Sequence, residues 1–330
     1  MSHITNSLAT VEQLYSRSTL NALPQDLQDT IFLAMQSLTQ AAGLLLRLPQ
    51  SVTAQANVVL ARYWVTISWP FVDEFSDISA ASLFLVAKLS SHPATPRDLC
   101  NVYAYLLSPL SPLFRSSSAS DPPSTKSDKT LYYLSEPGYN EAHARILALE
   151  SRILCALSFD THVALPHGLA VTYLKALDFL GVSPPAPLSQ RVVAYLNTAL
   201  LSPQLLYLTH QPSALAVAAI YNAAKDLGAK MPECAWWEVF DVDREELGFL
   251  VVGMRSVEGL VRASREKEVS AELHEGIMIT RAGLETEMRK RGMVLGNGAP
   301  ASGSGGNAAP LTEEDILMRS LDERADQMDS

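Results

Sequence analysis

The sequence predicts an all-α protein with two successive groups of five helices. Apolar residues recur at helical spacing along most of the 330 residues. No stretch alternates β-branched and polar residues, and no Asn-Gly turn joins two apolar runs, so strands are not expected. The two groups share a similar string, AASLFLVAKL at 80–89 and AAIYNAAKDL at 218–227. This wide spacing indicates a duplicated domain, because the repeats of a solenoid are about 20–50 residues long.

The first group is expected over residues 27–160, after an N-terminal arm (1–26). Its helices are predicted at 27–46, 51–67, 78–89, 97–107 and 140–157. The first helix carries an apolar stripe, namely Ile31, Met35, Leu38, Ala42 and Leu45. Ser51 and Asp77 are expected to cap the second and third helices, and Pro96 lies in the favoured first turn of the fourth. The third helix is apolar almost all round, which places it in the centre of a core.

Residues 108–136 separate the fourth and fifth helices and are rich in Ser, Pro and Asp. This composition indicates a disordered insertion, with an ordinary long loop as an equal alternative.

The second group is expected over residues 161–264, after a linker at 158–166. Its helices are predicted at 167–180, 188–201, 212–227, 232–240 and 243–263, with prolines between them. A charged C-terminal helix is expected to continue over 265–291. A flexible Gly-rich tail should follow over 292–330, in which residues 311–328 can form a short amphipathic helix.

Composition argues against several classes of function. A net charge of −10 disfavours direct binding of nucleic acid or of anionic membranes. The longest apolar run, at 214–224, is far shorter than the roughly 20 residues of a membrane span. The N-terminus has no secretory signal pattern. Cys100, Cys155 and Cys234 form no CxxC pair, and we interpret them as reduced core residues of a cytosolic or nuclear protein.

Sequence motifs of catalysis are missing as well. His274-Glu275 lacks the second histidine of a zinc protease motif, and no GxSxG string occurs. The glycines at 292–306 do not follow a predicted strand, so they cannot form a phosphate-binding turn. We therefore expect no catalytic, cofactor-binding or metal-binding residues and no enzymatic activity.

Two charged residues stand in apolar helices. Lys88 ends the apolar run of the third helix, and Glu150 is embedded in the apolar pattern of the fifth. A lysine at a helix end can extend its ammonium to water, and a glutamate can occupy the solvated side of an amphipathic helix. The other interpretation is that both face a partner, because a charge beside a core needs water or an opposite charge.

Several strings resemble the cyclin family. SLTQAAGLLLRLPQSV (37–52) is similar to the first-helix signature of the cyclin L group. ISAASLFLVAKLSSHPATPRDLCNVY (78–103), ALESRILCALSFDTHVALPHGLAVTYLKAL (148–177) and HQPSALAVAAIYNAAKDLGAKMP (210–232) resemble transcription-type cyclins. The resemblance covers about residues 27–260 and implies the cyclin fold, with two tandem five-helix cyclin boxes.

The resemblance also implies a function. The matching lysine and glutamate of cyclins hydrogen-bond main-chain groups of the kinase C-helix, which orders the active kinase. Carried over, the kinase-binding residues would be Lys88, Leu89, Glu150, Leu154 and Phe159. The chain would then be a non-enzymatic regulatory subunit in a heterodimer with a cyclin-dependent serine/threonine kinase.

The expected process is RNA polymerase II transcription or pre-mRNA processing. The expected location is the nucleus, with the cytoplasm as a further site. The chain lacks the Arg/Ser-rich tail of metazoan cyclin L proteins, and its own tail is acidic. The alternative function is a cyclin-fold scaffold that acts without a kinase, as general transcription factors do.

Overall fold

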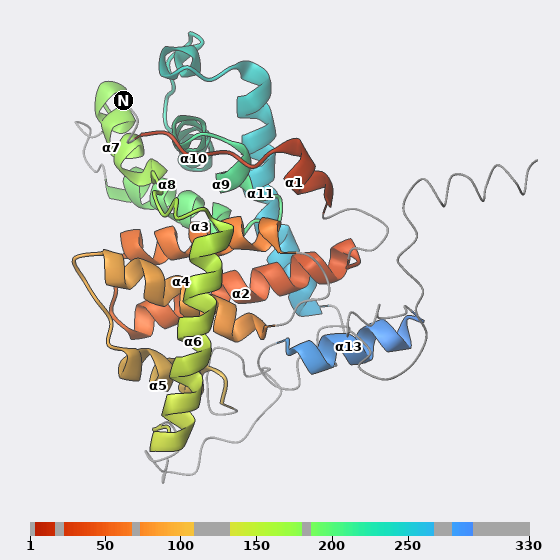
Figure 1. Cartoon of the computed structure of the whole chain (residues 1–330). Helices are drawn as coiled ribbons and strands as arrows, with labels where there is room; N and C mark the ends of the chain where they lie inside the picture. Colours follow the sequence, from red (N-terminus) through yellow and green to blue (C-terminus); the bar gives the residue numbers. More distant parts are fainter. Residues whose placement is uncertain are drawn as a thin grey trace, which may run out of the picture. The chain divides into compact units, whose positions relative to one another are not determined.

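The computed structural model describes residues 4–16, 23–67, 73–108, 133–179, 186–266 and 279–292, and the regular elements within these ranges are all helical (Figure 1). The all-α prediction is therefore confirmed there. Residues 1–295 form one compact unit, to which all the described residues belong. The predicted insertion, apart from its edges, and the predicted tail beyond residue 292 lie outside the described residues.

The first bundle contains five helices. They are α2 (Gln25–Leu45), α3 (Gln50–Thr66), α4 (Phe75–Leu89), α5 (Pro96–Leu106) and α6 (Glu136–Ala156). Helix α4 contacts the other four, and its residues from Ile78 to Ala87 are all buried. The prediction of a central third helix is confirmed. Figure 1 shows α6, in yellow-green, running the length of this bundle.

The second bundle is built around α10. Its elements are α7 (Pro166–Ala176), α8 (Ala186–Ala199), α9 (Leu206–Thr209), α10 (Pro212–Leu227), the 3-10 helix η2 (Trp236–Phe240) and α11 (Arg244–Glu266). Helix α10 contacts α7, α8, α11 and η2, so the two similar strings of the sequence form the central helices of their bundles. Gly228 ends α10 in the left-handed conformation, with φ of 63°.

An N-terminal arm joins the two bundles. Asn6 exchanges hydrogen bonds with Ala164, which lies in the linker after α6, at 2.9 and 2.7 Å. The Asn6 backbone N–H donates to Gln211 Oε1, and the Ala9 N–H donates to the Leu208 carbonyl at 2.8 Å. The arm ends in a short helix, α1 (Val11–Ser16), which contacts α3. Neither this helix nor α9 was predicted from the sequence.

The prediction of one charged helix over 265–291 is wrong. Helix α11 ends at Glu266, and a separate helix, α13 (Arg281–Lys290), starts where Thr280 Oγ1 accepts a hydrogen bond from the Gly283 N–H. Leu284 and Met288 of α13 are buried. The Arg281 N–H donates to Glu74 at the start of α4, and Arg291 pairs with Asp26 at 2.8 Å at the start of α2. Helix α13 therefore lies against the first bundle.

Several local expectations fail for identifiable reasons. Leu45, the last residue of α2, is 42% exposed although its spacing continues the apolar stripe. Helix α3 begins directly after Pro49 and α4 directly after Glu74, so Ser51 and Asp77 lie inside their helices and cap neither. Asp77 pairs instead with Arg145 of α6 at 2.9 Å.

Other boundaries shift as well. Helix α6 begins four residues before the predicted start because the Ser135 hydroxyl caps the Gly138 N–H at 3.4 Å. Helix α5 starts at Pro96, one residue before the predicted start, and Thr95 caps it. All three cysteines are free, but only Cys100 is buried, whereas Cys155 and Cys234 are exposed. The interpretation of all three as core residues is therefore wrong for these two.

Candidate functional site

Lys88 and Glu150 lie on neighbouring helices and form an ion pair. Lys88 is in the last turn of α4, and its Nζ lies 2.8 Å from Glu150 Oε1 on α6. The Lys88 side chain is 55% exposed, whereas that of Glu150 is 8% exposed. The ammonium also lies 5.4 Å from the centre of the buried Phe84 ring, a favourable cation–π distance.

This arrangement leaves hydrogen-bonding capacity for a partner. A buried carboxylate is costly unless it is paired, and Lys88 provides the opposite charge. An ammonium has three N–H donors and a carboxylate accepts at two oxygens. One bond between them leaves Lys88, which is half exposed, able to donate to carbonyl groups of a second molecule. The pair is thus held in place by the fold before any partner arrives.

Apolar side chains neighbour each member of the pair along its own helix, and another follows the end of α6. Leu89 follows Lys88 and is 62% exposed, and Phe159, in the turn after α6, is 69% exposed. Leu154 is half-buried one turn beyond Glu150 on α6. Exposed large apolar side chains that gather in one region indicate an interaction site. We call Lys88, Leu89, Leu147, Glu150, Leu154 and Phe159 the α4–α6 surface.

Phe159 is held by an unusual turn. Ser158 and Phe159 have φ of 50° and 63°, in the left-handed region that residues with side chains seldom adopt. The Phe159 N–H donates to the Leu154 carbonyl at 2.8 Å, which closes this turn at the end of α6. The phenyl ring is consequently exposed just beyond the helix that carries Glu150.

The structure brings together two of the five predicted site residues. Lys88 and Glu150 are in contact, which the sequence did not predict, since each was expected to bind a partner. Leu154 shares the face of Glu150, whereas Leu89 and Phe159 lie at the ends of α4 and α6. The sequence analysis missed Leu147, which is exposed one turn before Glu150. Its spacing of three residues from Glu150 and seven from Leu154 could have revealed it.

Within the described ranges, no group of three or more His, Cys, Asp or Glu side chains could hold a metal ion. In that part of the chain no helix has the length and apolar content needed to cross a membrane.

Several curated proteins are similar in sequence. An uncharacterised cyclin-L1-like protein of Schizosaccharomyces pombe is 33% identical over 211 residues, which cover 64% of this chain and 76% of that protein. Cyclin-L1 of Danio rerio is 26% identical over 94% of this chain and 57% of its own length. Cyclin-L2 of Homo sapiens is 28% identical over 71% of this chain and 41% of its own length. The matched region spans about half the length of these two vertebrate cyclins. No protein-family model matches.

Two solved structures share the fold. The yeast RNA Pol II CTD kinase CTDK-1 complex contains a chain that superimposes with a TM-score of 0.58 at 13% identity, over 96% of this chain and 89% of that one. The CAK complex of Chaetomium thermophilum bound to ATP-gamma-S gives a TM-score of 0.52 at 14% identity, over 90% and 95%. Together with the sequence relationship to the S. pombe protein, this fold shows that the chain belongs to the cyclin family, in the cyclin L group.

Proposed function

We propose that this cyclin is the regulatory subunit of a cyclin-dependent kinase and that it holds the C-helix of the kinase with the α4–α6 surface. The observation that carries the proposal is the Lys88–Glu150 pair, which a cyclin fold presents on an exposed surface with apolar neighbours. The two solved structures described above are kinase complexes, which supports a kinase as the partner.

The chemistry of the pair suits recognition of a main chain. The remaining N–H groups of Lys88 would donate to carbonyl groups, and Glu150 would accept from backbone N–H groups. Leu89, Leu154 and Phe159 would cover the apolar side chains of the same helix. Backbone groups and apolar contacts together would fix both the position and the rotation of the kinase helix.

The effect on the kinase would be allosteric. The cyclin performs no bond chemistry; it binds the active conformation of the kinase more tightly than the inactive one. To move a kinase from about 1% to about 99% active, the difference in affinity must be about 10⁴-fold. Interfaces of signalling assemblies commonly bury about 2,000 Å² or more in total, an area larger than six side chains provide. Other parts of the first bundle would therefore contribute.

The cellular setting is part of the proposal. The relationship to cyclin L and the likeness to a chain of an RNA Pol II CTD kinase complex support a role in RNA polymerase II transcription or pre-mRNA processing, in the nucleus. The net charge of −10 supports action through the kinase rather than through direct contact with RNA or DNA.

A paired-variant experiment tests the proposal. The chain is used to capture its kinase from a nuclear extract, with mass spectrometry to identify it, and the purified pair is then assayed for phosphorylation. Lys88→Ala with Glu150→Ala should abolish capture and kinase activation while circular dichroism shows a folded protein. Arg97→Ala with Glu136→Ala, which removes another ion pair of the same bundle, should leave both unchanged. Undiminished kinase binding by the first double variant would refute the assignment of the α4–α6 surface.

A further inference from the structure

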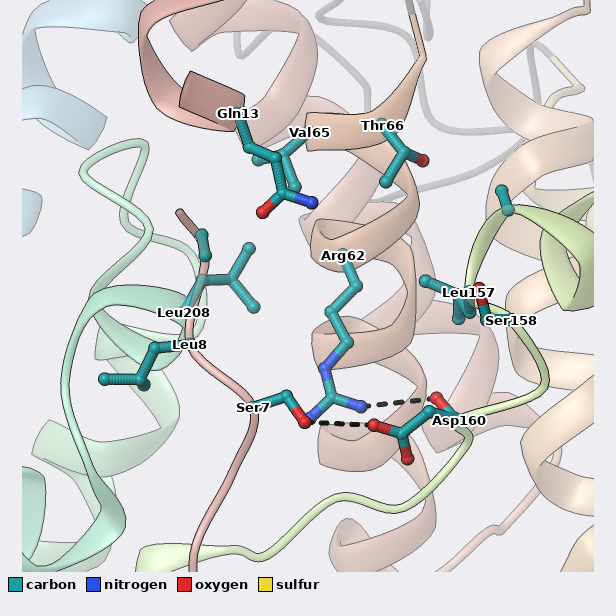
Figure 2. A pocket seen from close by; sticks show the side chains of 12 residues that line it. Ser7, Leu8, Gln13, Arg62, Val65, Thr66, Leu157, Ser158, Asp160 and Leu208 are labelled. Atoms are coloured by element: carbon teal, nitrogen blue, oxygen red, sulfur yellow. Dashed lines mark hydrogen bonds between the residues drawn. The ribbon is translucent and has the colours of Figure 1, made fainter. Parts of the chain in front are cut away.

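A small pocket lies between the N-terminal arm, the C-terminal end of α3 and the turn after α6 (Figure 2). Its volume is about 210 Å³. The lining residues come from four segments far apart in the sequence: the arm, α3, residues 156–160 and the second bundle. The volume is below the roughly 300–1,000 Å³ typical of sites for drug-sized ligands. The space suits one side chain or a small organic acid.

Arg62 is the notable residue of this pocket. Only 8% of Arg62 is exposed, although it carries a full charge. Its Nη1 donates to the His162 carbonyl at 2.7 Å and to the Asp160 carbonyl at 3.4 Å. Its Nε and Nη2 are buried and have no hydrogen-bond partner among the described residues. Figure 2 shows the guanidinium between Ser7 of the arm and Asp160 of the turn.

The unpartnered groups form one edge of the guanidinium. Nε–H and an N–H of Nη2 point in the same direction, and this edge binds two oxygen atoms of one carboxylate or phosphate in parallel. A buried donor without a partner costs about 1–3 kcal/mol, and more when it is charged. Two such donors on one edge match an acceptor with two oxygens, which reaches them only when neighbouring side chains move, because both nitrogens are fully covered in this structure.

The other lining residues determine which acceptor fits. Arg62 is the only cation among them, and the Asp160 carboxylate lies in the same lining, bound to the Ser7 hydroxyl at 3.0 Å. A phosphate group, with a charge of about −1.5 to −2, would meet this carboxylate without a second cation to offset the repulsion. The other walls include apolar residues that can contact a short aliphatic chain, namely Leu8, Ala9, Val65, Ala156, Leu157 and Leu208.

We propose that this pocket binds a carboxylate with a short aliphatic part, such as an acidic side chain or a small monocarboxylic acid, and that the Nε–Nη2 edge of Arg62 holds its two oxygens. Ser7 and Leu8 in the arm wall are exposed, so their side chains can rotate to admit it. The site is separate from the Lys88–Glu150 pair, although Phe159 lies between two of its lining residues, Ser158 and Asp160.

The test observes Arg62 directly in the full chain. The Arg62 Nε–H resonance is assigned by its loss in Arg62→Lys and followed by NMR during titration with sodium propionate. Two capped tripeptides form the second arm, one with a central glutamate and the other with glutamine in its place. Ala156→Phe should fill the pocket, and Cys155→Phe adds the same ring to the adjacent exposed position, which is outside the lining.

Saturable shifts with propionate or with the glutamate peptide, and none with the glutamine peptide, are expected. Shifts with propionate but not with the glutamate peptide would identify a small acid as the ligand. Shifts with the glutamate peptide would identify an acidic protein side chain. Binding should weaken at least about tenfold in Ala156→Phe and remain unchanged in Cys155→Phe. Three results would overturn the proposal: no response to either carboxylate, equal binding by Ala156→Phe, or tighter binding of inorganic phosphate than of propionate. No response to either carboxylate would mean that only water forms hydrogen bonds with the Nε and Nη2 groups of Arg62.

Discussion

Replacing Lys88 by methionine should leave the Glu150 carboxylate buried without its cation. Methionine keeps the length and much of the aliphatic stem, so the main loss is the bond between Nζ and Oε1 at 2.8 Å. Removing the partner of a buried polar group costs about 1–3 kcal/mol. Lys88 is 55% exposed, so water screens the pair and the cost should stay below that of a fully buried pair. We expect the free energy of unfolding to fall by about 1–2 kcal/mol.

A double-mutant cycle separates the pair from other effects of the substitutions. Glu150→Leu alone should cost little, because Lys88 can then turn its ammonium to water. The combination of Lys88→Met and Glu150→Leu leaves no buried charge and should recover most of the stability. The coupling energy should therefore be about 1–2 kcal/mol. The exposed Arg97–Glu136 pair, at 3.1 Å, is the matched control and should couple by less than about 0.5 kcal/mol.

Equilibrium unfolding in urea measures both cycles. The midpoint should move while the slope stays constant, which indicates a change in stability rather than in the compactness of either state. A loss of about 1–2 kcal/mol is measurable against a total stability of about 5–15 kcal/mol. If Lys88→Met costs no more than Arg97→Met, the Glu150 carboxylate is solvated by water and the pair is not held in place by the fold.

Gly43→Ala should destabilise the chain by about 1–3 kcal/mol, because an added Cβ would overlap Thr53 Oγ1 and lie 2.7 Å from Thr53 Cγ2. Gly168→Ala, in open space on α7, should stabilise it by up to about 1 kcal/mol in the same urea assay, and equal signs would contradict the close approach of α2 and α3. Burial lowers the pKa of His167 below its ordinary value of 6.5, so in acid the unfolded chain takes up a proton before the folded one does. Stability should therefore fall as the pH drops below about 6.5, and the fall should be smaller in His167→Gln; an unchanged slope would show that His167 does not contribute.

Much of the fold could be predicted because its signals are local. The apolar character of residues 78–89 on every side of a helix placed α4 in the core, and the Thr95-Pro96 start of α5 follows from capping over a few residues. The predicted caps at Ser51 and Asp77 are wrong because they too were inferred from local patterns. A local rule recognises a residue type that can cap but not whether the preceding residues have already entered the helix.

The sequence predicts residues for the candidate site but not their geometry. Lys88 and Glu150 were identified as odd charges in apolar helices, and the family resemblance indicated a partner for each. Lys88 and Glu150 pair because α4 and α6 pack with these residues facing each other. The spacing of residues in the sequence does not determine this relative rotation of the two helices. Leu147 belongs to the same surface and could have been found from its spacing along α6.

Sequence patterns alone were enough to predict the helical class, the central helices α4 and α10, the resemblance to cyclins and five of the six residues of the α4–α6 surface. These features depend on periodicity and on short strings, which involve residues close together in the chain. The Lys88–Glu150 pair, the position of α13 against the first bundle and the Arg62 pocket become visible only in the folded structure. Each of these depends on a hydrogen bond between residues at least 62 positions apart, and such contacts depend on the packing of whole helices rather than on local preference.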